Sequence, residues 1–206
     1  MPKKSDISTV IFDIGNVLVR WDPRNLYRQH FENTEEMEGF LREVTTPAWN
    51  LEQDRGRSFQ EAVALLSQAH PQHENMIKLF DTNWLEMLAG EISGSVNILK
   101  QLKADGVPVF AITNFSAEKW RDFCRGYDFP RLFQGVIVSG EEGLVKPDPA
   151  IFELAFSRFG LVPQNCIFID DILENIVVSQ SLGMVGHHFK DAETLARDLQ
   201  ARQLLR

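Results

Sequence analysis

The sequence predicts a doubly wound α/β fold, in which helices cover both faces of a parallel sheet. Short, nearly continuous apolar runs recur along the chain, and helix-like segments that end near glycine separate them. Apolar runs without alternating polar residues are typical of strands buried on both faces. Strands and helices in alternation indicate parallel strands joined by crossover helices. A third observation, a long block without strand runs, indicates an insertion.

Four apolar runs are the expected strands, and a fifth, weaker run is a further candidate. The four runs cover 9–12, 107–112, 135–139 and 166–169, and the weaker one covers 184–189. The expected helices cover 93–105, 117–126, 148–160 and 173–182. Each helix ends near a glycine, which readily adopts the left-handed conformation of a C-cap. These glycines are Gly106, Gly126, Gly160 and Gly183.

Residues 20–90 interrupt this alternation. No run in this block indicates a strand, but four amphipathic segments space their apolar residues by three or four, as on one face of a helix. These segments cover 23–31, 34–44, 58–69 and 73–88. We therefore expect 1–19 and 91–206 to form the core, and 20–90 to form a helical cap over the carboxyl edge of the sheet.

Composition limits the classes of partner and compartment. A chain of 206 residues fits one domain, or one domain with an insertion. The formal net charge of -8 argues against nucleic-acid and anionic-membrane partners, both of which need a positive surface. The two cysteines, Cys124 and Cys166, are too few for a disulfide scaffold or a zinc site. No signal peptide follows the opening MPKKSD, and no run approaches a membrane span, so we expect a cytoplasmic protein. The oligomeric state stays open.

Polar side chains follow the four strongest strand runs. A carboxylate follows the first, a hydroxyl and an amide follow the second, and a lysine lies beyond the third. Two carboxylates and a nearby asparagine follow the fourth. Because ligands bind outside the carboxyl ends of parallel strands, these groups are candidates for one site that holds a metal and an anion beside a nucleophile. The residues are Asp13, Thr113, Asn114, Lys146, Asp170, Asp171 and Asn175.

Carboxylates brought together at this edge would repel one another and need a cation. Mg2+ suits such oxygen ligands, because it binds through one or two carboxylates, a carbonyl and waters. The alternative is that Asp170 and Asp171 only cap the helix that follows them. The pairing of the two residues, with Asn175 one turn later and Asp13 on another strand, favours the metal.

The chain resembles the haloacid dehalogenase-like hydrolase superfamily over essentially its whole length. The motifs are FDIGNVL, ITN, the lysine of GLVKPDP and FIDDILEN, in that order. The resemblance implies a Rossmann-like core with a small helical cap inserted after the first motif. The fourth motif is similar to that of bacterial sugar-phosphate phosphatases and of the phosphatase domain joined to soluble epoxide hydrolases.

The resemblance also implies a role for each candidate residue. Asp13 is the nucleophile and forms an aspartyl-phosphate. Thr113 and the backbone amide of Asn114 hold the phosphoryl oxygens, and Lys146 neutralises the charge shared by Asp13 and phosphate.

The implied metal ligands are Asp171, Asp13 and the carbonyl of Gly15. Asp170 supports the metal through water or by orienting a neighbour, and Asn175 is a supporting residue.

Gly15 departs from the family pattern, because phosphatases of this family usually carry an Asp there as general acid and base. Three interpretations stay open. In the first, the chain is a phosphatase whose substrate has a good leaving group, or in which water or a cap residue moves the protons. In the second, it is a dehalogenase-type hydrolase. In the third, it binds a phosphorylated ligand or a protein partner without catalysis. The paired Asp170 and Asp171 favour a Mg2+-dependent phosphatase acting on a small phosphorylated metabolite such as a sugar phosphate.

Two segments of the expected cap could border the substrate. Asp54 and Arg55 either contact substrate or lie in a solvated turn. Arg20, Trp21 and Arg24 either line the cleft or serve as linker and packing residues. The sequence also places Phe115 next to the second motif, where it could border the pocket.

Overall fold

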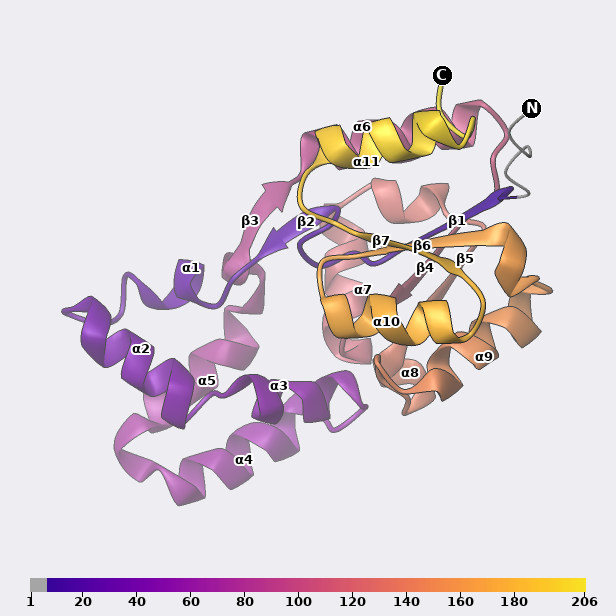
Figure 1. Ribbon diagram of the computed structural model, residues 1–206. Helices are drawn as coiled ribbons and strands as arrows, with labels where there is room; N and C mark the ends of the chain where they lie inside the picture. The colour runs from indigo at the N-terminus through magenta and orange to yellow at the C-terminus, as the bar shows by residue number, and fades with distance from the viewer. Residues whose placement is uncertain (1–6) are drawn as a thin grey trace.

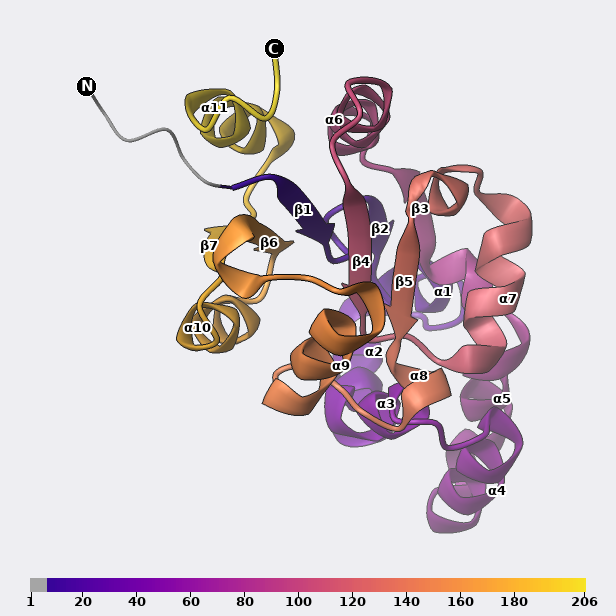
Figure 2. The same cartoon turned by 90° about the vertical axis from the view of Figure 1, so that its right-hand side faces the viewer.

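The computed structural model describes residues 7–206, so the opening MPKKSD lies outside the described residues. The central sheet has five parallel strands in the order β5-β4-β1-β6-β7 (Figures 1 and 2). Helices flank both faces, which confirms the predicted α/β fold. The strands are β1 (Thr9–Phe12), β4 (Val109–Thr113), β5 (Gly135–Val138), β6 (Cys166–Asp170) and β7 (Val185–His188).

Side chains of the central strand β1 alternate between two hydrophobic clusters, which is why two helical layers form. Val10 and Phe12 belong to the cluster that includes α6 and α11, whereas Ile11 belongs to the cluster that includes α9 and α10. Figure 1 shows these helix pairs above and below the sheet. The core helices are α6 (Ser93–Ala104), α7 (Ala117–Gly126), α8 (Ser139–Glu142), α9 (Pro149–Phe159), α10 (Leu173–Ser181) and α11 (Ala192–Ala201).

Glycines end three of the predicted helices as expected. Gly106 has a φ of 77° just after α6, Gly160 has a φ of 64° as the C-cap of α9, and Gly183 has a φ of 95° just after the C-cap of α10. Gly126 differs, because it is the last helical residue of α7 and is not in the left-handed region. None of the helices in residues 7–206 is long and apolar enough to cross a membrane.

The segment between β1 and α6 holds most of the predicted helices of the insertion. They are α1 (Arg24–Tyr27), α2 (Thr34–Glu43), α4 (Phe59–Ala69) and α5 (Glu74–Thr82), joined by an unpredicted α3 (Pro47–Asp54). Helix α1 is shorter than expected, and a 3-10 turn at Trp84–Met87 replaces the end of the segment predicted over 73–88.

The expectation that this block contains no strand was wrong at its two ends. Strands β2 (Val19–Trp21) and β3 (Leu88–Glu91) pair antiparallel and form a separate two-stranded sheet. Each strand is short and lacks an apolar run of its own, so neither has a local signal. They form a ribbon on which the chain leaves and re-enters the core (Figure 1).

Aromatic side chains hold the inserted helices together. The ring centroids of Tyr27 and Phe40 lie 5.0 Å apart, as do those of Trp49 and Phe80, in edge-to-face geometry. Such pairs contribute about 0.5–1.5 kcal/mol beyond their area burial. The same hydrophobic cluster continues into the core, and Lys119 on α7 forms an ion pair with Asp81 on α5. The insertion is therefore fixed against the sheet.

Candidate active site

The turn after β1 presents Asp13 at the carboxyl edge of the sheet. Asp13 N–H donates to the carbonyl of Ile169 on the neighbouring strand over 2.8 Å. The chain then reverses at Asn16, whose φ of 53° is a left-handed value that asparagine tolerates. The Asn16 side chain accepts a 3.0 Å hydrogen bond from Trp21 N–H, which closes the turn. The Gly-Asn pair of the first motif thus builds the loop that carries the carboxylate.

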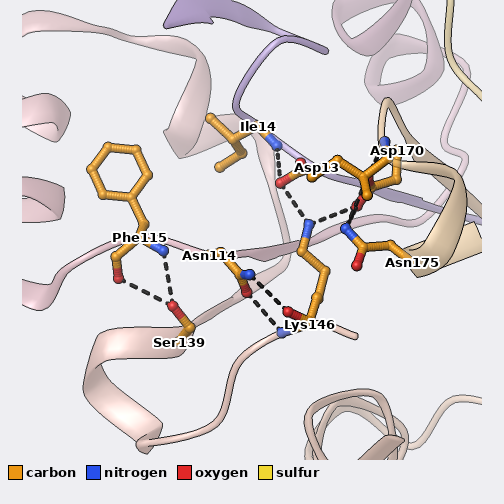
Figure 3. Close-up of polar contacts among 9 residues, drawn as sticks. Asp13, Ile14, Asn114, Phe115, Ser139, Lys146, Asp170 and Asn175 are labelled. Carbon is orange, nitrogen blue, oxygen red and sulfur yellow. Dashed lines mark hydrogen bonds and ion pairs between the residues drawn. The ribbon is translucent and has the colours of Figure 1, made fainter. Parts of the chain in front are cut away.

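A buried lysine lies between two carboxylates at this edge. Lys146 Nζ is 2.8 Å from Asp13 Oδ1 and 2.7 Å from Asp170 Oδ2 (Figure 3). Burial lowers the pKa of Lys146, but the two carboxylates outweigh it and the net shift is upward, so the side chain stays an ammonium. Asp13 Oδ1 also accepts the Ile14 N–H over 2.7 Å. Both of these contacts to the Asp13 carboxylate fall on Oδ1.

Asp170 is fully buried and bound from several sides. Besides Lys146, it accepts hydrogen bonds from Asn175 Nδ2, 3.0 Å from each of its oxygens, and from Ile172 N–H over 2.8 Å. The contact to Ile172 lies in the turn before α10, whose N-cap is Ile172 and which has no side-chain capping hydrogen bond, so the capping alternative for Asp170 and Asp171 is not seen in the structure. Asn175 and Lys146 together fix the orientation of this carboxylate.

Three carboxylates at the site could hold a metal ion. Oxygens of Asp13, Asp170 and Asp171 all lie within 4.8 Å of one another. Burial raises the pKa of Asp13 and of Asp171, and the neighbouring Asp170 raises both further. A hard divalent cation would offset this crowding of negative charge, and an all-oxygen donor set is what Mg2+ prefers. The residues present therefore fit such an ion.

The residues after β4 hold the lysine loop in place. Asn114 Oδ1 accepts from Lys146 N–H over 2.8 Å, and Asn114 Nδ2 donates to the Lys146 carbonyl over 3.0 Å (Figure 3). This two-way contact joins the second and third motifs, a role that the sequence does not reveal. Thr113 is the last residue of β4 and is buried beside the site.

Two adjacent cavities open beside this edge. The smaller, about 100 Å³, is lined by Gly15, Asn114 and Phe115 from the core and by residues of the insertion. The larger, about 510 Å³, lies among the inserted helices, and Trp21 and Asn50 line both. The structure thus brings Phe115 and Trp21 to the cleft, as the sequence allowed.

Two arginines that the sequence suggested as cleft residues form hydrogen bonds with other groups of the same chain. Arg24 borders the larger cavity, but its guanidinium forms two hydrogen bonds with Glu38, of 2.6 and 2.8 Å. Arg20 donates to the carbonyl of Glu91 across the β2–β3 ribbon.

The sequence left open whether Asp54 contacts substrate or lies in a solvated turn. Asp54 is the last residue of α3, and it lines the smaller cavity together with Gly15. Burial raises the pKa of Asp54 to about 7, and the nearby Asp13 charge adds to this shift. Ser139 Oγ, at the start of α8, donates to the Asp54 carbonyl over 2.5 Å. No local sequence signal connects residues 54 and 139.

Comparison with known proteins assigns the domain type. A family model of haloacid dehalogenase-like hydrolases matches residues 7–183. The sesquiterpene phosphatase astK of Aspergillus oryzae is 35% identical over 109 residues, which are 53% of this chain and 55% of that protein. The glyceraldehyde 3-phosphate phosphatase of Pyrococcus furiosus is 30% identical over 115 residues, which are 55% of this chain and 48% of that protein. The matches therefore span about half the length of these curated relatives.

Solved structures share the fold. A HAD family enzyme of Bacteroides thetaiotaomicron superposes with a TM-score of 0.73 at 23% identity, covering 94% of this chain and 98% of that one. The same enzyme has been solved with magnesium and inorganic phosphate, with a TM-score of 0.68 at 24% identity and coverage of 90% and 95%. At this identity the likeness establishes the fold.

Proposed function

The chain belongs to the haloacid dehalogenase-like hydrolase family, and we propose that it is a Mg2+-dependent phosphatase of small phosphorylated metabolites. The observation that carries this proposal is Lys146, buried between Asp13 and Asp170 with Asp171 beside them. The proposal assigns 1–19 and 91–206 to the catalytic core and 20–90 to a cap that covers the site.

In the proposed reaction, a carboxylate oxygen of Asp13 attacks phosphorus. The bond from phosphorus to the leaving oxygen breaks, and an aspartyl-phosphate forms on Asp13. The Thr113 hydroxyl and the Asn114 backbone amide bind phosphoryl oxygens, and the Lys146 ammonium offsets the charge that builds up beside Asp13. Water then attacks phosphorus, releases inorganic phosphate and restores the carboxylate.

The metal would be held by Asp13, Asp171 and the Gly15 carbonyl. Mg2+ supplies charge neutralisation at the phosphoryl oxygens when bound. Asp170 acts through Lys146, because Lys146, Asn175 and the Ile172 N–H already bind its oxygens. Asn175 keeps Asp170 oriented.

Two observations favour phosphoryl transfer over a dehalogenase-type reaction. Displacement of halide by Asp13 needs no third carboxylate, whereas Asp171 completes a cluster suited to a divalent cation. Relatives with 30% identity or more over part of the chain include phosphatases of a sesquiterpene and of glyceraldehyde 3-phosphate. Both names denote phosphatases of small organic compounds.

The cavities are consistent with a substrate of that size. The smaller one reaches Gly15 and Asn114, where the phosphoryl group would lie, and the larger one of about 510 Å³ is in the range of small-molecule sites. In the proposal, the leaving group extends past Trp21 and Asn50 into the larger cavity.

The test compares two reactions in parallel. Phosphate release from p-nitrophenyl phosphate is measured with Mg2+ and with EDTA, and halide release from 2-chloropropionate is measured under the same conditions. Mg2+-dependent phosphate release is the expected result. Halide release without metal would point to dehalogenation, and no turnover of either compound would point to a binding protein.

A further inference from the structure

One titratable residue lines the smaller cavity beside Asp13. Among the described residues that line it, most are apolar or amide side chains, and Asp54 alone carries an ionisable group. The loop that follows Asp13 supplies none, because the cavity wall there is Gly15. A Cβ added at Gly15 would meet nothing within 4 Å, so the space in front of this residue is open.

The structure holds Asp54 in a fixed position relative to the core. Its carbonyl accepts the 2.5 Å hydrogen bond from Ser139 Oγ, and Ser139 Oγ in turn accepts the Phe115 N–H over 2.8 Å. Phe115 directly follows Asn114, a residue of the proposed phosphoryl site. Asn50 Nδ2 donates to Asp54 Oδ2 over 3.2 Å and limits rotation of the carboxyl group.

We propose that Asp54, reaching the core from the insertion, is the general acid and base of this phosphatase. The inference rests on the proposed function, since it assigns a proton-transfer role within that reaction. It places on the cap the group that Gly15 does not provide.

Proton transfer by Asp54 balances both half-reactions. When Asp13 attacks phosphorus, the electron pair of the breaking P–O bond moves to the leaving oxygen, and the Asp54 carboxyl gives that oxygen its proton. The products are an alcohol, the aspartyl-phosphate and the Asp54 carboxylate. In the second half, Asp54 takes a proton from the attacking water, the P–O bond to Asp13 breaks, and its electron pair returns to the Asp13 carboxylate. Inorganic phosphate leaves and Asp54 is protonated again.

The surroundings of Asp54 suit a group that alternates between its two protonation states. Burial raises its pKa to about 7, and the Asp13 charge adds to the shift, while Lys146 and the Ser116 backbone oppose it. The C-terminal position on α3 acts in the same direction as burial, because the negative end of a helix disfavours a carboxylate. A general acid is most effective when its pKa lies near the working pH.

Leaving-group dependence separates an acid from a structural residue. An alkoxide needs a proton to leave, whereas p-nitrophenolate does not. We expect Asp54→Asn to lower kcat/KM by about 10²–10⁴-fold for an alkyl phosphate that the wild type hydrolyses. For p-nitrophenyl phosphate we expect kcat/KM to fall by less than about tenfold. The second half-reaction still lacks its base, so we also expect a burst of p-nitrophenolate followed by slow turnover.

The control is Glu52→Gln, which removes an acidic side chain from the same helix outside the cavity. Glu52→Gln should leave kcat/KM unchanged for both the alkyl and the aryl ester. Equal losses of Asp54→Asn on the two esters, or no loss on either, would overturn the role of Asp54. A wild type inactive on both esters would instead refute the proposed function. If Asp54→Asn lacks the wild-type melting transition, Asp54→Ser takes its place in the same comparison.

Discussion

The hydroxyl of Ser139 in the core donates a 2.5 Å hydrogen bond to the backbone carbonyl of Asp54 in the insertion. Ser139 is fully buried and also accepts the N–H of Phe115. One side chain therefore joins the loop after β4, where phosphate would bind, to the end of the inserted helix α3. The position of Asp54 over the site depends on this contact.

Replacing Ser139 with alanine should displace Asp54 and destabilise the fold. The Phe115 N–H loses its acceptor, and a buried unsatisfied donor costs about 1–3 kcal/mol. We expect the ratio of kcat/KM for the alkyl ester to kcat/KM for the aryl ester to fall about tenfold, which corresponds to about 1.4 kcal/mol. Urea unfolding and the two ester assays measure these effects. Ser179→Ala, at another buried serine whose Oγ donates to a carbonyl within α10, should change stability but not the ratio.

Removing the ammonium of Lys146 should leave two buried carboxylates without a counter-charge. Breaking a buried ion pair in this way costs about 3–5 kcal/mol. We expect Lys146→Met to lower the free energy of unfolding by this amount in EDTA. Adding Asp170→Asn removes one of the unpaired charges and should restore part of the loss. A Lys146→Met protein as stable as the wild type would contradict the buried pairing seen in the structure.

Asp54 should make the protein less stable as the pH rises. Its pKa is about 7 in the fold and about 3.9 in an unfolded chain, so between these values the folded state binds the additional proton. Stability from this group is complete below about pH 4 and is lost as the pH approaches 7. Asp54→Asn should therefore gain stability relative to the wild type between pH 5 and pH 8, measured by urea unfolding in EDTA. A constant difference would show that Asp54 titrates normally.

Asp171 should govern the metal requirement. Asp171→Ala removes one of the three clustered carboxylates without touching the Lys146 bridge. We expect loss of nearly all phosphate release and of tight Mg2+ binding in a calorimetric titration, with the melting transition retained. An unchanged Mg2+ titration would refute the assignment of Asp171 as a ligand.

The core was predictable because its strands carry local signals. The run at 9–12 and the run that begins at Cys166 are short, apolar and buried, and the structure pairs them directly. Strands β2 and β3 were not predictable in this way, since Val19 pairs with Glu91 across the whole insertion. Such a pairing depends on tertiary contacts rather than on apolar periodicity.

The site residues likewise differ in whether a local sequence signal predicts them. The residues at strand ends were predicted because parallel strands bring their carboxyl ends to one edge, and Asp13, Lys146 and Asp170 do meet there. Asp54 was undecided, since its proximity to the site depends on how the insertion folds back and on the Ser139 contact. Residues placed by docking of helices leave no pattern in the local sequence.

The most direct test of the account is chemical trapping of the intermediate on Asp13. The protein is mixed with Mg2+ and p-nitrophenyl phosphate, quenched during turnover and reduced with borohydride, which converts an aspartyl-phosphate to homoserine. Peptide mass spectrometry should then find homoserine at position 13, and Asp13→Asn should show neither this product nor phosphate release. Phosphate release with an unmodified Asp13, or undiminished release by Asp13→Asn, would contradict the assignment of Asp13 as the nucleophile.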